Sequence, residues 1–439
     1  MSLNKMDQSS VVRYHWLLTT LGAMGVLIDG YDLSVISFTI LLISPIFGIS
    51  STSSPFLYGT VLASGLIGMA IGGITFGWLA DKLGRKTMFV VDLILFVVFA
   101  ILSSVAQNVF EVILFRILLG IGIGADYPIS STLISEFAPA KRRGMLLMFG
   151  IMFYWIGAML AFAVSLLALR FGADLAWRIP LLAGGIIAIP VVIARNITAE
   201  SPRWLLQRNR VEKAKRIVEE KLGIDIGQVS RYKEHTIGEL FTKYVRNTTF
   251  VLVAWFAFDV GAYGLGFYTS TLYKQLGIGN LEEIAIFGAV SSLFPILAYV
   301  SSMFMVDRYG RKMMTLIGFI SMIIILGLLP PLTSINAYLL LPLWILYSSL
   351  EQWPGGALSF AYSVELFPTS LRGLAQGLST TVSRIGGIIG VILFPYISKY
   401  YGLQLGTFFF IGFLALAVVV TLLLAPETMA KSLEEITEK

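Results

Sequence analysis

The sequence predicts an all-α membrane protein whose twelve transmembrane helices form two bundles of six. Hydrophobic residues make up 56% of its 439 residues and charged residues only 13%, with a mean hydropathy of +0.82. An ordinary soluble domain is about a quarter charged. A spanning helix needs about 20 mainly apolar residues, and the chain contains twelve such stretches. Motifs of the first half return in the second, which indicates two related bundles.

The boundaries of the spans follow from the apolar stretches. The first stretch, from Trp16 to about Phe47, is too long for a signal peptide and lacks an early cleavage site. The predicted spans are 17–46, 56–79, 87–107, 110–136, 144–169, 177–196, 249–275, 283–306, 313–333, 338–365, 373–398 and 405–425. A polar, Lys/Arg-rich insert separates the sixth span from the seventh. We therefore predict an N-terminal bundle at 1–196, a cytoplasmic linker at 197–247, and a C-terminal bundle with a short tail at 248–439.

Basic residues gather in the loops on one side of the predicted membrane. These loops are the ones that contain Arg85, Arg142 and Arg311, and the linker lies on the same side. The loops on the opposite side hold only isolated charges. By the positive-inside rule, both termini and the linker are cytoplasmic in a multi-pass protein of the cell membrane. The net charge of +6 therefore reflects membrane topology, and we expect no binding to nucleic acid.

The chain has no cysteine, and both histidines, His15 and His235, lie outside the predicted spans. Disulfides and thiolate metal sites are therefore excluded, and we expect no metal and no cofactor. No convergent set of nucleophiles or metal ligands occurs within the spans, so an enzyme is not expected.

Two short motifs repeat at nearly the same offset. Residues 81–86, Asp-Lys-Leu-Gly-Arg-Lys, return as Asp-Arg-Tyr-Gly-Arg-Lys at 307–312, an offset of 307 − 81 = 226. Glu-Phe-Ala-Pro at 136–139 returns as Glu-Leu-Phe-Pro at 365–368, an offset of 365 − 136 = 229. Two parallel repeats around a midplane site are the arrangement that alternating access by rocking requires.

The ten residues from Gly77 to Lys86 resemble the signature loop of the major facilitator superfamily, and the second copy occupies the corresponding loop. Gly84 permits a tight turn, while Asp81 and Arg85 can pair with neighbouring helix ends. These contacts would break and reform as the halves rock. Segments 116–122, 200–204 and 426–428 also resemble this superfamily. The predicted gating residues are Asp81, Arg85, Glu136, Arg143, Asp307, Arg311, Glu365 and Arg372.

Segments 122–128 and 255–263 resemble the phosphate:proton symporter family more specifically. Trp255, Asp259 and Tyr263 are spaced i, i+4, i+8, so they share one stripe of a helix, as expected for a cavity wall. The resemblance implies that these residues contact phosphate and that the pair Asp126 and Tyr127 also lines the site. Alternatively, the aromatic residues only pack between helices.

Several charged residues fall inside predicted spans, where a charge costs about 2.5 to 3.5 kcal/mol on insertion scales and usually serves a site. Asp29-Gly-Tyr-Asp32 also resembles the motif of aromatic-acid:proton symporters, and Asp259 lies 230 residues after Asp29 (259 − 29). A buried carboxyl can take up and release a proton, which would couple transport to protons. The alternative is a structural ion pair of Asp32 or Asp126 with Arg116. The predicted proton-coupling residues are Asp29, Asp32, Arg116, Asp126, Asp259 and Glu351.

Arg384 carries the most information about the substrate. A guanidinium near the bilayer centre needs either a permanent acid or an anionic ligand. A permanent pair with Glu351 is the structural alternative. Where the phosphate symporters have Gln and Asn, this chain has Tyr154 and Gly356. The predicted substrate-binding residues are Tyr127, Tyr154, Trp255, Asp259, Tyr263 and Arg384.

Together these features predict a monomeric symporter that moves protons and a small anion through the lipid bilayer. Inorganic phosphate is favoured, a small organic acid is the second candidate and a sugar the third; export is also open. A non-transporting nutrient sensor, or a membrane enzyme acting on lipid, is disfavoured. A sensor would be expected to carry a long signalling tail, whereas this chain ends about a dozen residues after Pro426.

Overall fold

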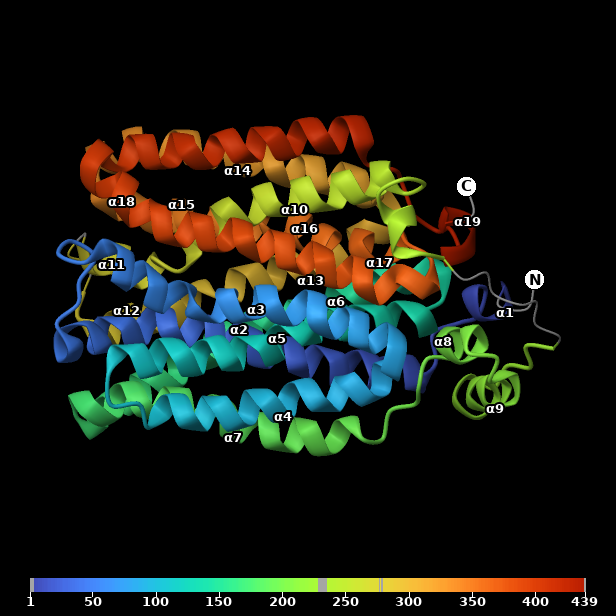
Figure 1. The fold of residues 1–439 in the computed structure, drawn as a ribbon. Helices are drawn as coiled ribbons and strands as arrows, with labels where there is room; N and C mark the ends of the chain where they lie inside the picture. Colours follow the sequence, from blue (N-terminus) through green and yellow to red (C-terminus); the bar gives the residue numbers. More distant parts are fainter. Residues whose placement is uncertain (1–3, 228–234, 276, 278, 438–439) are drawn as a thin grey trace.

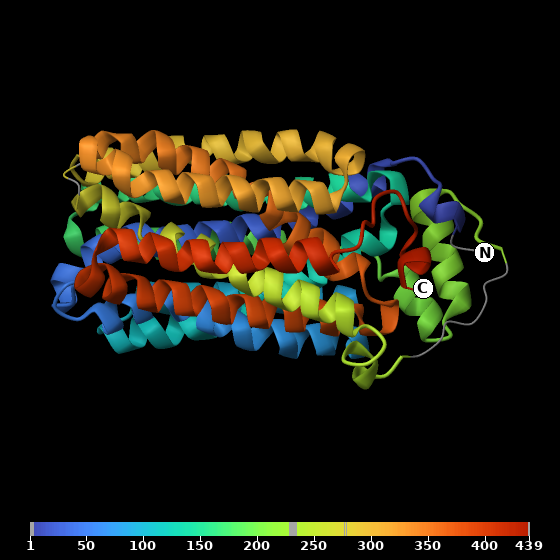
Figure 2. The ribbon, with the colours of Figure 1, turned by 90° about the horizontal axis from the view of Figure 1, so that it is seen from above.

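The computed structural model of the chain describes residues 4–227, 235–275, 277 and 279–437, and these contain helices but no strand. Long helices run side by side along one common direction in both views (Figures 1 and 2). The helices of the first half are α1 (Asn4–Asp7), α2 (Arg13–Phe47), α3 (Pro55–Leu83), α4 (Arg85–Ser104), α5 (Val109–Phe137), η1 (Ala140–Arg142), α6 (Arg143–Ala168), η2 (Leu169–Phe171) and α7 (Ala173–Arg195).

The linker and the second half continue the series. The linker holds α8 (Pro202–Gln207), α9 (Val211–Leu222) and η3 (Ile237–Leu240). The second half comprises α10 (Val245–Gly266), α11 (Thr269–Gln275), α12 (Leu281–Ser291), α13 (Leu293–Tyr309), α14 (Arg311–Ile335), η4 (Ala337–Leu339), α15 (Leu340–Leu350), α16 (Gln352–Gly356), the π-helix η5 (Ala357–Tyr362), α17 (Ser363–Glu365), α18 (Thr369–Leu424) and α19 (Leu433–Thr437).

The predicted count of twelve spans agrees with these helices. Ten segments of the described chain are long and apolar enough to cross a membrane. The other two are α5, which buries Arg116 and Asp126, and the interrupted helix from Leu340 to Glu365. The long α18 supplies two spans because it is broken at Gly402, which has φ 81° and ψ 164°. The chain reverses direction at this break (Figure 1).

The two halves pack directly on each other through α3 against α18 and through α6 against α12 and α13. Small residues allow the close approach of α3 to α18, as is usual between membrane helices. A Cβ on Gly377 would lie 2.2 Å from the carbonyl oxygen of Gly73. Glycine is therefore required at this crossing of the two halves.

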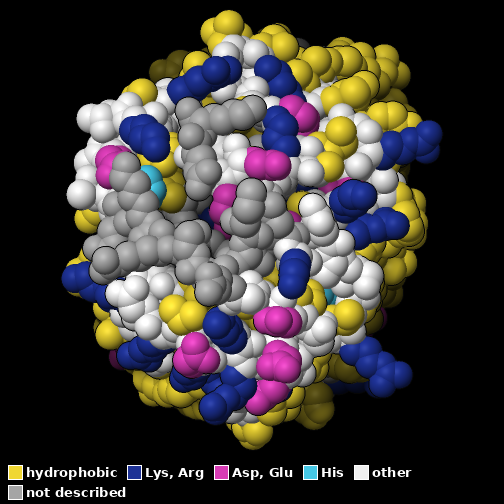
Figure 3. Space-filling view, turned by 90° about the vertical axis from the view of Figure 1, so that its right-hand side faces the viewer, with side chains coloured by type: hydrophobic (Ala, Val, Ile, Leu, Met, Phe, Trp, Pro, Cys, Tyr) yellow, Lys and Arg dark blue, Asp and Glu magenta, His cyan; other side chains and the backbone are white. Residues whose placement is uncertain are grey.

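Both termini, α8, α9 and α19 lie at the same end of the bundle (Figure 1). Figure 3 views this end and shows Lys, Arg, Asp and Glu side chains across it, with hydrophobic side chains along the flanks. We refer to it as the terminal end; it is the end that the distribution of basic residues predicts to be cytoplasmic.

Candidate transport site

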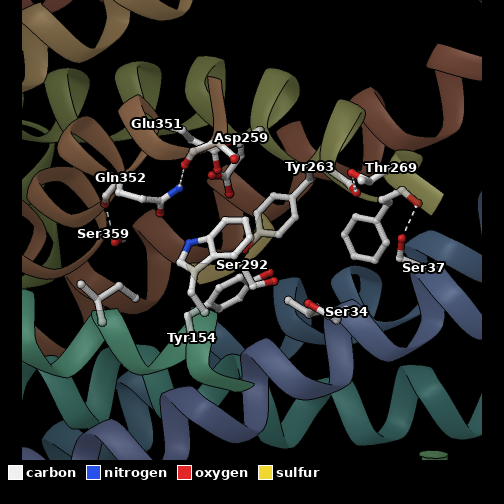
Figure 4. A pocket seen from close by; sticks show the side chains of 18 of the residues that line it. Ser34, Ser37, Tyr154, Asp259, Tyr263, Thr269, Ser292, Glu351, Gln352 and Ser359 are labelled. Carbon is white, nitrogen blue, oxygen red and sulfur yellow. Dashed lines mark hydrogen bonds between the residues drawn. The ribbon is translucent and has the colours of Figure 1, made fainter. Parts of the chain in front are cut away.

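A cavity of about 120 Å³ lies between the two halves. Side chains from α2 and α6 on one side and from α10 and α16 on the other point into it (Figure 4). The structure brings together on its wall all six residues predicted to bind substrate: Tyr127, Tyr154, Trp255, Asp259, Tyr263 and Arg384. Their contact with a substrate remains a prediction.

Arg384 is buried in α18 and forms an ion pair with Asp259, with 2.5 Å between Nη1 and Oδ2. Its guanidinium carbon also lies 4.8 Å from the ring centre of Tyr127, 4.9 Å from that of Tyr263 and 5.7 Å from that of Trp255. Aromatic faces stabilise a cation at such distances. Its Nε has no hydrogen-bond partner among the described residues. One N–H donor of the guanidinium is therefore still available.

The proposed pair of Arg384 with Glu351 is wrong in this structure. The partner of Arg384 is Asp259, because α10 packs directly against α18. Glu351 lines the cavity but forms no ion pair with any described residue. The alternative in which Trp255 and Tyr263 only pack between helices also fails in part, since both line the cavity.

Aromatic side chains dominate the cavity wall. Ten of its 26 lining residues are aromatic, so flat apolar faces surround the few charged groups. Sequence reasoning missed six of these ten, because an aromatic residue in a span has the same local pattern whether it packs or lines a cavity. The six are Trp155, Phe162, Phe258, Phe267, Tyr299 and Trp344.

Asp32 and Arg116 form a buried pair within the N-terminal half. Arg116 Nη1 donates to Asp32 Oδ1 at 3.0 Å and Nη2 donates to Oδ2 at 2.8 Å. This bidentate geometry matches the structural ion pair considered as an alternative for Asp32. Neither side chain lines the cavity.

A second buried cluster in this half joins three helices around Arg195 of α7. Arg195 contacts Asp126 of α5 at 2.6 Å and Asp92 of α4 at 3.1 Å. Asp29 of α2 is fully buried, and neither of its carboxylate oxygens has a hydrogen-bond partner among the described residues. The resemblance that placed Asp126 on the cavity wall is therefore wrong for this residue, whereas its neighbour Tyr127 does line the cavity.

Sequence reasoning missed Asp92 and Arg195. Both lie inside predicted spans, at 87–107 and 177–196, so the argument that charged residues in spans serve a site applies to them as well. Their charge inside a span marks both residues as candidates, but the sequence does not show which residues they pair with.

The predicted gating residues meet in two ion-pair clusters at the terminal end. In the first, Arg85 contacts Asp81 at 2.9 Å and Glu136 at 3.4 Å, and Glu136 contacts Arg372 of the other half at 2.8 Å. Asp81 also accepts a hydrogen bond from the backbone nitrogen of Leu374 at 2.8 Å. This cluster therefore joins α3, α4 and α5 to α18.

The second cluster repeats this design with the halves exchanged. Arg311 contacts Asp307 at 2.9 Å and Glu365 at 3.0 Å, and Arg143 of the first half lies 4.0 Å from Glu365. Asp307 accepts a hydrogen bond from the backbone nitrogen of Met145 at 2.9 Å. Both clusters thus tie the halves together at the terminal end.

Two glutamates complete the symmetry outside the spans. Glu200 accepts hydrogen bonds from the first backbone nitrogens of α4, and Glu427 does the same for α14. A carboxylate at a helix N-terminus satisfies free N–H groups and the positive end of the helix dipole. Burial raises the pKa of Glu200. The 200–204 and 426–428 segments thus supply equivalent caps to the two halves.

The chain ends join the same network through Arg203 of α8. Arg203 contacts Asp7 of α1 at 3.0 Å and Glu434 of α19 at 3.2 Å. Burial raises the pKa of Glu434, but the adjacent guanidinium outweighs this effect and brings the pKa to about 2. The pair with Glu434 therefore persists throughout the physiological pH range.

Contacts between the halves also exist at the opposite end of the cavity. Tyr58 and Thr271 share a hydrogen bond of 2.8 Å, and Lys399 donates to the carbonyl oxygen of Thr52 at 2.9 Å. The halves thus touch at both ends of the cavity.

Two six-helix halves, a cavity between them and ion-pair clusters at one end define a membrane transporter of the major facilitator fold. The chain belongs to the sugar (and other) transporter family, whose pattern it matches over residues 18–439. The fold is that of a major facilitator superfamily proton:xylose symporter, XylE, with a TM-score of 0.86, 24% identity, and coverage of 96% of this chain and 98% of that chain.

Relatives of nearly equal length are named for different solutes. The chain is 27% identical to a putative metabolite transport protein, YaaU, of Escherichia coli, covering 94% of this chain and 92% of the relative. It is 26% identical to the niacin transporter NiaP of Acinetobacter baylyi, covering 99% of each. It is 28% identical to a putative inorganic phosphate transporter of rice, covering 99% and 93%. The transporter class is confirmed, whereas the specific resemblance to phosphate symporters is not.

Proposed function

We propose that this protein is a proton-coupled symporter of a small organic acid. The observation that carries the proposal is Arg384, which lies on the cavity wall with part of its fork unused and aromatic rings around it. A guanidinium binds a carboxylate through parallel hydrogen bonds. Aromatic faces suit the carbon skeleton of an organic acid. The niacin transporter among the relatives carries a solute of this kind.

Phosphate is a weaker candidate for this cavity. Arg384 is the one basic residue on the described lining, and one guanidinium balances a single carboxylate better than a phosphate with more than one negative charge. Tyr154 and Gly356 replace two polar residues of the phosphate symporters. A multivalent oxyanion would therefore find hydroxyl donors on the wall but only one cation.

A sugar is the second candidate function. The family and the shared fold with a xylose symporter favour it, and aromatic rings also stack on sugar faces. Recognition of several hydroxyls, however, depends on convergent polar groups. Besides the hydroxyls of seven Ser and Thr residues, the described lining includes a single side-chain amide, that of Gln352.

For the proton, we propose that a carboxyl within the spans is the carrier. Asp29 of the N-terminal half has no hydrogen-bond partner among the described residues, whereas Asp32 and Asp126 are held by arginines. The terminal end would be cytoplasmic, and its two ion-pair clusters would open when the halves rock toward the inward-facing state.

A counterflow assay tests the substrate class directly. Liposomes that contain the purified protein would be loaded with a small carboxylate, inorganic phosphate or a sugar. Uptake of a labelled carboxylate such as nicotinate from outside would then be measured, with each class of solute as a competitor. We expect carboxylates to exchange and the other classes to compete poorly. Exchange of a sugar or of phosphate, without exchange of any carboxylate, would refute the proposal.

Removal of Asp81 is expected to favour the inward-facing state. Asp81→Ala deletes an ion pair and hydrogen bonds to two backbone nitrogens of α18. Loss of one charged hydrogen bond changes a free energy by about 1.5 to 3 kcal/mol, which shifts the conformer ratio about tenfold or more. Distances between spin labels on the two halves would report the shift.

The matched control for this variant is Asp174→Ala. Asp174 forms an exposed i, i+4 pair with Arg178 in α7, far from the terminal-end clusters. It should leave the distances unchanged. An unaltered distribution in Asp81→Ala would show that this cluster does not hold the end closed.

A further inference from the structure

The charges of the ionised side chains on the described cavity wall do not sum to zero. Among the described residues, the lining carries three charged side chains, those of Asp259, Glu351 and Arg384. Asp259 and Arg384 neutralise each other at 2.5 Å. An ionised Glu351 would therefore leave the cavity with one net negative charge beside the site proposed for an anion.

Among the residues that the structure describes, no neighbour of Glu351 supplies the missing positive charge. Its carboxyl interacts electrostatically with that of Asp259 on α10, and the amide nitrogen of the neighbouring Gln352 donates to the carbonyl oxygen of Ser348. The other titratable groups near it are phenols: Tyr154 of α6, Tyr299 of α13 and Tyr347 of the preceding α15. Arg384 lines the same cavity but is held by Asp259. Glu351 is half-buried on a wall rich in aromatic rings. A carboxylate that is poorly solvated and has no cation is unfavourable, so it binds a proton or a cation.

Glu351 also lies in an interrupted part of the C-terminal half. It joins α15 to the short α16, which leads into the π-helix η5. Such π-helical turns are frequent at functional sites. The segment touches the other half, because a Cβ on Gly356 would lie 2.7 Å from Sδ of Met148 in α6. Rocking of the halves would therefore change the surroundings of Glu351.

We propose that Glu351 carries the proton that is transported together with the substrate. The carboxylate takes up one proton from the side to which the cavity opens, and the cavity lining then becomes neutral. The anion binds beside Arg384 only in this protonated state. After the halves have moved, the carboxyl releases its proton and the restored negative charge expels the anion. This inference rests on the proposed anionic substrate, and it assigns the coupled proton to the cavity wall rather than to Asp29.

The protonation of Glu351 can be tested without any substrate. Infrared spectra of the purified protein between about pH 5 and about pH 9 would show the carbonyl band of a protonated carboxyl. We expect a band that disappears at high pH, that is absent from Glu351→Gln and that persists in Asp29→Asn and in the exposed control Asp174→Asn. An unchanged pH-dependent band in Glu351→Gln would overturn the proposal.

The link to substrate is tested by binding of benzoate and nicotinate. Calorimetry in two buffers of different ionisation enthalpy gives the protons bound per ligand, for which we expect about one in the wild type and none in Glu351→Gln. The wild-type affinity should fall about tenfold per pH unit at high pH, whereas the variant keeps one affinity and still exchanges substrate, but without proton-driven accumulation.

Two outcomes separate this proposal from the proposed function. If Glu351→Gln binds the carboxylates more weakly at every pH, Glu351 contacts the substrate as an anion and the inference is wrong. If the wild type binds neither carboxylate, the organic-acid function fails, while the infrared result still decides whether Glu351 holds the proton.

Discussion

Replacement of Arg384 by glutamine is expected to lower transport by about 100-fold or more, while Arg384→Lys retains weakened transport. Removing one partner of a buried ion pair costs about 3 to 5 kcal/mol, and here it would also remove the single basic group on the described cavity wall. Lysine keeps the charge but loses the planar fork that binds a carboxylate. Counterflow of nicotinate in liposomes measures the loss.

A double variant separates the two roles of Arg384. If the guanidinium serves only to compensate Asp259, Arg384→Gln combined with Asp259→Asn should regain much of the transport, because no stranded carboxylate remains. We expect no such recovery for a carboxylate. Recovery of transport in the double variant would contradict the organic-acid function and favour a sugar as the substrate. Undiminished transport of a neutral sugar by Arg384→Gln would do the same.

Arg195→Met is expected to give the largest loss of stability of any substitution considered. Arg195 is fully buried, donates to the carbonyl oxygen of Phe89 at 2.8 Å and holds both Asp92 and Asp126. Its removal leaves two buried carboxylates without a cation, at a cost of about 3 to 5 kcal/mol or more. Thermal unfolding of the purified protein in detergent would show a large fall in melting temperature.

The variant is informative even if it does not fold. Arg195→Met combined with Asp92→Asn and Asp126→Asn removes the stranded charges and should recover much of the folded protein. Arg170→Met, at an exposed arginine beyond α6, is the control and should unfold as the wild type does. Wild-type stability of Arg195→Met would contradict the structural role of the cluster.

The order of the spans was predictable because each span is a local property. The bilayer sets a length of about 20 residues, so hydropathy alone placed the helix at 56–79, which the structure has at Pro55–Leu83. The break between the last two spans was also predictable, because a polar, glycine-containing segment interrupts two apolar runs. Gly402 supplies that break with a positive φ.

Part of the candidate site was predictable for a similar reason. The i, i+4, i+8 spacing of Trp255, Asp259 and Tyr263 specifies one helix face, and this face lines the cavity. The repeated loops likewise indicated two clusters at one end, and both exist. Adjacent residues diverge on a helix, however, which is why Tyr127 reaches the cavity and Asp126 does not.

The sequence by itself therefore determined the membrane class, the twelve spans, the two related halves and the kinds of residue available for transport. Only the tertiary structure decided which charges are partners: Asp259 with Arg384, Asp32 with Arg116, and Asp92 and Asp126 with Arg195. The physical reason is that apolarity and length act within one helix, whereas an ion pair depends on the rotation and packing of two helices distant in sequence. Glu351, which that packing leaves without an ion pair among the described residues, was indistinguishable in the sequence from the acids that have one.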